Sequence, residues 1–310
     1  MTIIKNIKAL LKEQDLSIFI YFRLKNGIVK LADIDNDVLP DLLKIYCNEM
    51  RNEITEKENL EILKLSHADE RKNVIFKYDF ETDREPFLSI DNVIEDNNIQ
   101  PFSFSDDKLE NIDGFIAKIG NSKKAAYFYT KFYPVNLIKQ GKVIKLIKSD
   151  ARFEKFKEEL LQLTGKFDII SYNSDYYIKK IEILERYYSF EEVIKKKAKK
   201  GFKKITKLNI LSDSLKFEKY LDKGLTRSKK LIKVMASSKV ISKSISNRDL
   251  INFVANHPIL KKSMAIDSDN SQFILKTNKH CDIFIKILDD DYLRSELTKE
   301  EYDAIAKNSV

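Results

Sequence analysis

Residues 114–132 read Gly-Phe-Ile-Ala-Lys-Ile-Gly-Asn-Ser-Lys-Lys-Ala-Ala-Tyr-Phe-Tyr-Thr-Lys-Phe. Gly114–Ile119 and Ala125–Phe132 are rich in β-branched and aromatic residues, which favour strands. Between them, Gly120-Asn121-Ser122 has the composition of a turn, and Pro134 ends the second strand. The stretch therefore predicts a β-hairpin, with which the second region of the chain begins.

The same patterns predict further strands around this hairpin. They are Leu16–Leu24, a partner near Ile28–Leu31 after the hairpin signal Asn26-Gly27, Asn73–Tyr78, Val143–Ile147, a hairpin of 167–172 and 175–181, and Phe273–Lys276. Helical spacing of apolar residues predicts helices over 2–13, 38–53, 151–163 and 279–293, and over most of 181–256. We therefore predict an α+β fold of mixed or antiparallel strands with packed helices, and a helical basic segment in the C-terminal half.

A polar, acidic stretch with two prolines covers residues 81–108. Composition of this kind is typical of a linker. It predicts an N-terminal α+β domain over 1–108 and a second domain over 109–310, which contains the basic segment 190–248.

Composition limits the class of protein. No apolar run approaches the ~18 residues of a membrane span, and lysines interrupt the N-terminus, so we expect a cytoplasmic protein that reaches a membrane only through a partner. Cys47 and Cys281 lie among apolar residues, which is typical of buried free thiols in a reducing compartment. Only seven glycines occur in 310 residues, which argues against Gly-rich phosphate loops.

Positive charge is concentrated in one segment. Val193–Arg248 holds eighteen lysines and arginines against three acidic residues, a net charge of +15 in a chain whose total is +8. A local excess of this size indicates a surface that binds a polyanion.

The first basic helix is predicted to start at Ser189, a candidate N-cap that two glutamates follow. Ile194, Ala198, Phe202 and Ile205 form its apolar stripe. No acidic residue lies among its lysines, so no i,i+4 pair is expected to relieve their repulsion. The candidate phosphate contacts on this helix are Lys195, Lys196, Lys199, Lys200, Lys203, Lys204 and Lys207.

A second basic helix is predicted over 225–237. It and the serine-rich stretch after it add the candidates Arg227, Lys229, Lys230, Lys233, Lys239 and Lys243. Lysine point charges suit contacts with phosphate that do not depend on base sequence, and eight of them predict a log–log salt slope of about −7 on duplex DNA. A solvated lysine-rich surface, an acidic protein or an anionic lipid remains an alternative interpretation.

Signs of catalysis are weak. His67, His257 and His280 lack metal-ligand spacing, and no nucleophile elbow, Walker loop or dinucleotide fingerprint is present, so no cofactor is predicted. Asp289-Asp290-Asp291 is a compact acidic cluster. It leaves open a metal-dependent nuclease, although a helix cap or pairing with the basic segment is favoured. The sequence thus favours a binding protein over an enzyme.

Three stretches carry a family resemblance: Phe115–Gly120 with Ala126–Ile138, Phe167–Ile170 with Tyr177–Phe190, and Phe284–Thr298 with Tyr302 and Lys307 behind it. In these the chain resembles the KwaB-like family of the Kiwa anti-phage system over roughly 110–310. The pattern Leu-x-Asp-Asp-Tyr-Leu-x-Ser-x-Leu-Thr is its most specific part.

The resemblance implies a role in antiviral defence, binding of phage DNA, a homodimer, and assembly with the membrane-spanning partner subunit of the Kiwa system, which would hold the chain at the inner membrane. It does not identify the residues that contact DNA.

Overall fold

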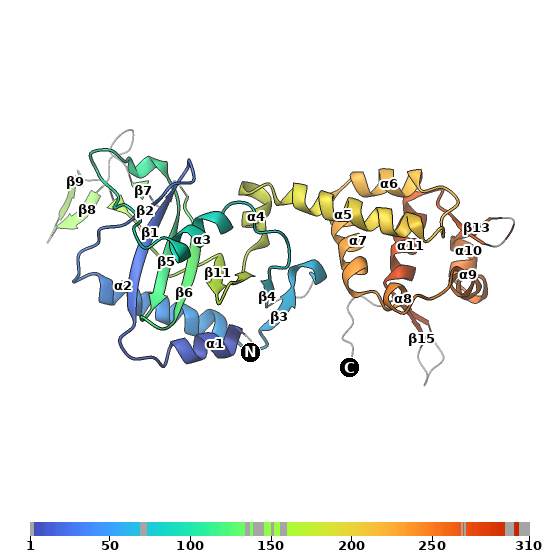
Figure 1. Ribbon diagram of the computed structural model, residues 1–310, viewed down its shortest axis with the longest axis horizontal. Coiled ribbons are helices and arrows are strands. Elements are labelled where there is room, and N and C mark those ends of the chain that lie inside the picture. The colour runs from blue at the N-terminus through green and yellow to red at the C-terminus, as the bar shows by residue number, and fades with distance from the viewer. Residues whose placement is uncertain are drawn as a thin grey trace. The chain divides into compact units, whose positions relative to one another are not determined.

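The computed structural model describes residues 3–68, 73–133, 137–138, 146–149, 152–155, 160–267, 269, 271–294 and 301–303. The chain divides into two compact units, Met1–Ile62 with Asn73–Leu184, and Leu63–Lys72 with Glu185–Val310. The first unit is built around a β-sheet and the second mainly from helices (Figure 1). The α+β class is therefore confirmed.

The sheet of the first unit has eight strands in the order β2-β1-β5-β6-β11-β12-β4-β3. The strands are β1 (Ser17–Leu24), β2 (Val29–Leu31), β3 (Glu61–Lys64), β4 (Val74–Lys77), β5 (Ile112–Gly120), β6 (Ala125–Lys131), β11 (Ile169–Tyr172) and β12 (Asp175–Ile178). Neighbours from β2 to β4 pair antiparallel, which confirms the three predicted hairpins, β1 with β2, β5 with β6 and β11 with β12. Asn173 and Ser174 have the positive φ that a tight hairpin turn requires.

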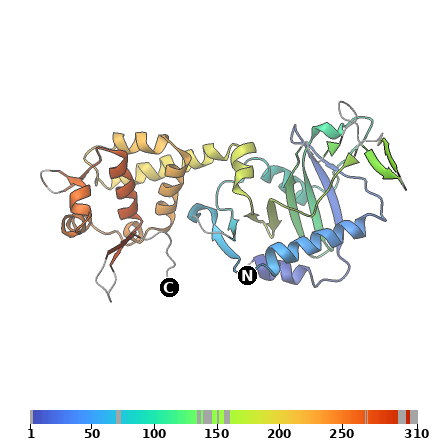
Figure 2. The same ribbon diagram turned by 180° about the vertical axis from the view of Figure 1, so that it is seen from behind.

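Helices cover the two faces of this sheet unequally. Helix α1 (Ile3–Leu10) and helix α2 (Leu39–Met50), which the π-turn η1 (Arg51–Thr55) extends, run across one face (Figure 2). The core between them includes Ile7, Tyr46, Ile20, Phe115 and Phe128. Helix α3 (Phe87–Glu95) lies on the opposite face and covers only part of it (Figure 1). Short 3₁₀ turns, η2 (Leu65–His67) and η3 (Leu109–Asn111), and helix α4 (Ile181–Tyr187) complete the connections.

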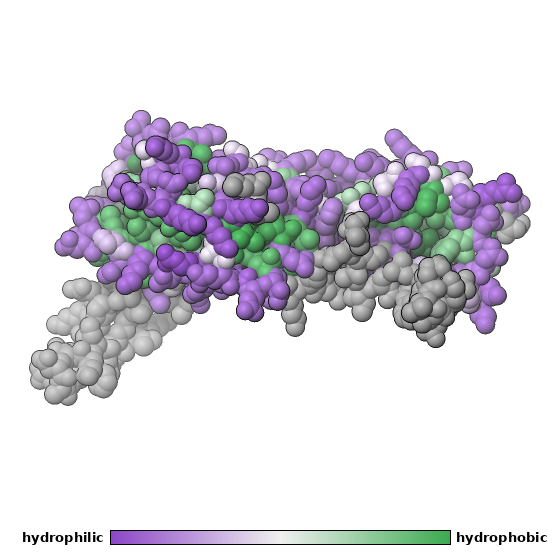
Figure 3. All heavy atoms as spheres, turned by 90° about the horizontal axis from the view of Figure 1, so that it is seen from below, coloured by the Kyte–Doolittle hydropathy of each residue, from purple (hydrophilic) through white to green (hydrophobic). Residues whose placement is uncertain are grey.

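The second unit packs helices around an aromatic core. The helices are α5 (Phe190–Lys207), α6 (Leu215–Asp222), α7 (Leu225–Ser237), α8 (Lys239–Ser242), α9 (Asn247–Asn256), α10 (Leu260–Ser263) and α11 (Asn278–Leu288). Strand pairs β13 (Ala265–Ile266) with β14 (Phe273–Ile274) and β15 (Tyr292–Arg294) with β16 (Glu301–Asp303) join them. The Phe284 ring lies 5.4 Å from that of Phe217 and 5.9 Å from that of Phe273. On the face shown in Figure 3, hydrophilic residues surround smaller apolar patches in each unit.

One predicted helix is wrong. Within 151–163, β9 (Arg152–Lys155) pairs antiparallel with β8 (Leu146–Ser149), and β10 (Leu160–Leu161) pairs with β7 (Leu137–Ile138). Strand pairing therefore overrides the helical spacing of apolar residues. Residues 156–159, and the part 143–145 of the predicted strand 143–147, lie outside the described residues.

The boundary predicted between residues 108 and 109 differs from the division into compact units. The stretch 81–108 contains α3, and the backbone of Gln100 and Phe102 bonds to Leu31 at the end of β2. Strand β5 then pairs with β1, so segments before and after residue 108 share one sheet. A polar stretch with two prolines can belong to a domain when hydrogen bonds tie its backbone down.

Candidate nucleic-acid interface

Helix α5 is the central element of the predicted interface. Ser189 occupies its N-cap position with a positive φ of 49°, and its side chain makes no capping hydrogen bond. Glu191 and Glu192 lie in the first turn, where carboxylates stabilise the helix dipole. The Lys195 ammonium lies 2.6 Å from the Glu191 carboxylate, so the prediction that no i,i+4 pair relieves the lysines is wrong at this turn.

The apolar stripe of α5 fixes which face the lysines occupy. Ile194, Ala198 and Ile205 are buried, and the Phe202 ring lies 6.1 Å from that of Phe217. At Gly201 the helix passes so close to α7 that an added Cβ would lie 2.9 Å from Met235 Cγ. This packing turns the remaining positions of α5 toward solvent.

All seven candidate lysines of α5 are exposed. In the part of the chain that the structure describes, Lys199, Lys203, Lys204 and Lys207 have no carboxylate within ion-pair distance. Lys204 and Lys207 lie in the last turn, where cations stabilise the helix dipole. We define the exposed cations Lys199, Lys203, Lys204 and Lys207 as the α5 lysine face.

Several candidates of α7 have internal partners instead. The Arg227 guanidinium lies 4.4 Å from the Tyr220 ring centroid and donates to the Tyr220 carbonyl at 3.3 Å. Lys229 pairs with Glu185, and Lys233 Nζ lies 3.1 Å from Asp289 Oδ2. Lys230, Lys239 and Lys243 are exposed. The basic segment 190–248 therefore does not form one continuous surface of cations that are available to a ligand.

A hollow of about 290 Å³ lies beside the first half of α5. Lys195, Lys196 and Lys199 line it together with Ser228 of α7 and the carboxylates Glu218 and Asp222 of α6. These carboxylates reduce the positive potential at the first half of α5. The second half of α5 is consequently the better candidate for contact with an anion.

One further cation adjoins that second half and was missed as a candidate. The Asn247 side chain at the start of α9 donates to the Leu208 carbonyl at 2.9 Å, just beyond the end of α5. The next residue, Arg248, is exposed. Sequence spacing alone does not bring Arg248 to α5, since forty residues separate Arg248 from Leu208.

The acidic cluster Asp289-Asp290-Asp291 forms the end of α11. Asp290 has a positive φ of 59°, and the N–H groups of Asp290 and Asp291 donate to the carbonyls of Ile287 and Lys286. This is the Schellman arrangement, here with Asp in the position that Gly usually occupies. Among the described residues, no group of three His, Cys, Asp or Glu side chains could hold a metal ion. The cap and the pairing with Lys233 are as the sequence analysis favoured.

Outside the acidic cluster, the side chains of His257, Cys47 and Cys281 pack against other parts of the fold. His257 is buried, and its Nδ1 accepts from the N–H groups of Ile259 and Leu260 at 3.3 Å. Cys47 and Cys281 are free thiols, and burial raises the pKa of both.

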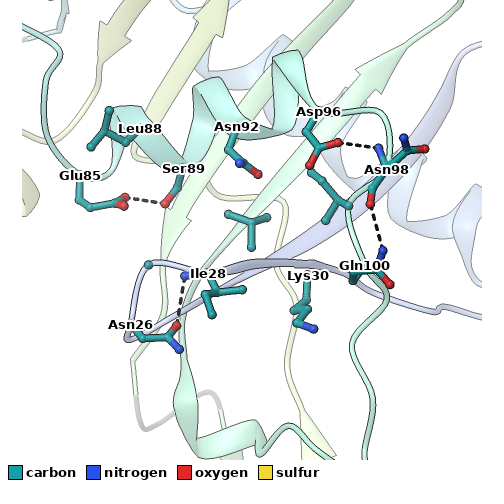
Figure 4. A pocket seen from close by; sticks show the side chains of 13 residues that line it. Asn26, Ile28, Lys30, Glu85, Leu88, Ser89, Asn92, Asp96, Asn98 and Gln100 are labelled. Atoms are coloured by element: carbon teal, nitrogen blue, oxygen red, sulfur yellow. Dashed lines mark hydrogen bonds between the residues drawn. The ribbon is translucent and has the colours of Figure 1, made fainter.

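A second hollow, of about 560 Å³, lies in the first unit between β2, α3 and the loop that follows α3. Asn26, Asn92, Asn98 and Gln100 give it an amide-rich wall, as Figure 4 shows. Beneath it, Glu85 accepts from buried Arg23, and Asp113 pairs with both Arg23 and Lys131. The carboxylates of Glu85 and Asp113 therefore have cationic partners within the first unit.

Comparison with known proteins identifies the family. A family described as "Kiwa protein KwaB-like" matches residues 109–298. The chain belongs to the KwaB-like family. It is 30% identical over 290 residues to "Kiwa protein KwaB" of Escherichia coli O55:H7 (strain RM12579 / EPEC). The aligned residues make up 91% of this chain and 90% of that protein. No solved structure matches.

The similarity reaches beyond the family match. The match of the KwaB-like family begins in η3 and crosses both compact units, whereas the similarity to the Escherichia coli protein covers nearly the whole chain. Since that similarity covers 91% of the chain, most of the region before residue 109, for which the sequence analysis named no resemblance, belongs to what the two proteins share. Within the described residues, no helix has both the length and the hydropathy that a membrane crossing requires.

Proposed function

We propose that this KwaB-like chain is the DNA-binding subunit of a Kiwa anti-phage defence system, and that it contacts DNA phosphates through the α5 lysine face. Family membership supports the role in Kiwa defence. The DNA contact rests on one observation: four exposed lysines of one helix have no carboxylate partner among the described residues.

The energetics of such a face favour an anionic partner. Like charges on neighbouring turns destabilise an isolated helix, and among the described residues the α5 lysine face has no carboxylate partner, so the helix dipole is what offsets this repulsion. A phosphate backbone replaces the repulsion with attraction and releases condensed counterions. A lysine ammonium is a point charge without the rigid planar fork of arginine, so we expect these lysines to contact phosphate and binding to be tolerant of sequence.

The test is charge reversal with a matched control. Lys199→Glu, Lys203→Glu, Lys204→Glu and Lys207→Glu together should abolish binding to a fluorescent duplex in an anisotropy titration. The control reverses Lys5, Lys8, Lys12 and Lys25, which are exposed lysines of the first unit, and changes net charge by the same amount. It should retain most of the affinity.

Salt dependence separates phosphate contact from general attraction. Binding by the wild-type chain should weaken steeply as salt rises, and four phosphate contacts should contribute about −3.6 to its log–log slope. Unchanged affinity in the α5 variant, with circular dichroism showing intact helices, would overturn the assignment. Binding of an acidic protein or of anionic vesicles, with no binding of DNA, would favour the scaffold alternative.

The proposal includes two partners that rest on the family resemblance. They are a second copy of this chain and the membrane-spanning subunit of the Kiwa system, which would bring the chain to the inner membrane. Co-purification with that subunit, and the mass of the purified chain from light scattering, test them.

A further inference from the structure

The sheet of the first unit has one face that α3 leaves partly open. Along β1, Ile18, Ile20 and Phe22 point into the core beneath α1 and α2, so Phe19 and Tyr21 lie on the opposite face. Phe19 is 46% exposed, and it lies on β1 before the residues that pair with β2. Figure 1 shows the lower parts of β1, β5 and β6 without a helix in front of them.

The strand register brings three side chains of this face into one row. Phe19 of β1 is opposite Lys118 of β5, and Lys118 is opposite Tyr127 of β6. The Lys118 ammonium lies 5.8 Å from the centroid of the Tyr127 ring. Strand spacing places Phe19 and Tyr127 about 10 Å apart, and Tyr21 follows Phe19 at about 7 Å along β1. We define Phe19, Tyr21, Lys118 and Tyr127 as the sheet platform.

Helix α3 closes the other end of the same face. Arg23 donates to Ser89 at 3.2 Å and to Glu85 at 3.0 Å, and the Phe87 ring lies 4.8 Å from that of Tyr176. These contacts hold α3 over the ends of the strands. The sheet platform therefore begins where the cover by α3 stops.

We infer that the sheet platform binds single-stranded nucleic acid by stacking unpaired bases on Phe19 and Tyr127, with Lys118 between them to contact phosphate. Four-stranded sheets that bind single-stranded RNA stack two or three bases on aromatic side chains of the sheet face. Stacking tolerates any base, because each has a flat π-face.

The charge and residue composition of the sheet platform favour single-stranded nucleic acid over a protein as its ligand. The centres of protein interfaces are depleted in lysine, whereas here a lysine occupies the middle of the row. Lys123 in the turn between β5 and β6 is exposed and adds positive charge at the open end. Burial raises the pKa of Tyr21 and Tyr127, so both phenols stay protonated and can donate hydrogen bonds.

The inference is independent of the α5 lysine face, because the two surfaces share no residue. The sheet platform can bind unpaired bases even if α5 does not bind duplex DNA, and each failure is seen separately. Substitution of the platform should leave duplex binding unchanged, and reversal of the α5 lysines should leave base stacking in place.

The absence of tryptophan from the chain permits a direct test. Phe19→Trp introduces a single indole on the platform, and a stacked base should quench its fluorescence when oligothymidylate or oligouridylate is added. Phe104→Trp is the control, since Phe104 is 77% exposed in the same unit but lies outside the sheet. Its fluorescence should change little. Comparison of the two oligonucleotides distinguishes DNA from RNA.

A second variant measures the contribution of the ring. Phe19→Ala in the full-length chain should weaken binding to the single strand by about 5- to 150-fold, the range for loss of one stacked base, while Phe104→Ala should not. The inference is overturned if neither oligonucleotide quenches the Phe19→Trp indole. It is equally overturned if that signal depends on protein concentration alone, because the platform would then be a contact between two copies of the chain.

Discussion

Helices α5 and α7 pack against each other and both are rich in cations, yet their side chains have different electrostatic surroundings. On α7, Arg227 stacks on Tyr220, Lys229 pairs with Glu185 and Lys233 pairs with Asp289. The α5 lysine face has no such partners in the described part of the chain. The difference teaches that a count of lysines does not measure a binding surface. Cations held by internal partners contribute to folding, and the rest remain available to a ligand.

The largest expected effect comes from neutralising equal numbers of cations on the two helices. Lys203→Gln, Lys204→Gln and Lys207→Gln together should weaken duplex binding by about 10- to 100-fold and make the salt slope less negative by about 2.7. Arg227→Gln, Lys229→Gln and Lys233→Gln should change the slope by less than about 0.9, the value for one contact.

Unfolding by urea completes this test. The α5 variant should keep its stability within about 0.5 kcal/mol, as surface substitutions usually do. The α7 variant should lose stability, because Asp289 and Glu185 lose their partners. Equal losses of DNA affinity from the two variants would show that the internal partners do not distinguish the helices.

The next prediction concerns Gly201, where α5 packs closely against α7. Gly201→Leu places a side chain where even a Cβ would lie 2.9 Å from Met235 Cγ. Overpacking of about 1–3 kcal/mol should outweigh the roughly 1 kcal/mol that leucine gains in helix propensity. Urea unfolding should therefore show a net loss of up to about 2 kcal/mol. Thr206→Leu, at an exposed position of α5, should show no comparable loss; a more stable Gly201→Leu would mean that α7 can move away.

A smaller effect is expected where α7 meets the end of α11. Lys233→Ala leaves the mostly buried Asp289 carboxylate without its ammonium partner, which should lower the free energy of unfolding by about 1 kcal/mol. Lys230→Ala, on the exposed side of the same helix, is the control and should change stability by less than about 0.5 kcal/mol. If Lys233→Ala and Lys230→Ala change the free energy of unfolding equally, the contact of Lys233 with Asp289 does not stabilise the fold.

Local patterns were enough to predict most of the elements around these sites. Runs of β-branched and aromatic residues predicted the strands from Leu16–Leu24 to Asp175–Ile181, and helical spacing predicted α5, α7 and α11. The helix predicted over 151–163 failed because strand pairing, which is not local, decided its structure. The 81–108 stretch likewise reads as a linker until its hydrogen bonds to β2 are known.

The sequence predicted where the candidate lysines of α5 lie, but it did not predict which candidate lysines form ion pairs with carboxylates. Helical spacing placed the seven candidate lysines of α5 on exposed positions, because the apolar stripe fixes the buried face. The partners Glu185 and Asp289 lie more than forty residues from the lysines they meet, so no spacing rule reveals them. The sheet platform had a signal in the sequence, since Phe19 and Tyr127 occupy the alternate face of predicted strands. Their alignment depends on the register.

The smallest expected effect lies at the start of α5. This helix contains both a lysine with a carboxylate partner and, in the described part of the chain, lysines without one. Glu191→Gln frees Lys195 from its only i,i+4 partner among the described residues and should lower stability only slightly, because the pair is exposed to solvent. The same change removes a negative charge beside the α5 lysines, so duplex affinity should rise slightly. Glu182→Gln, an exposed glutamate of α4, controls for net charge. If both substitutions raise affinity equally, Lys195 acts through overall charge and the DNA contact is confined to the second half of α5.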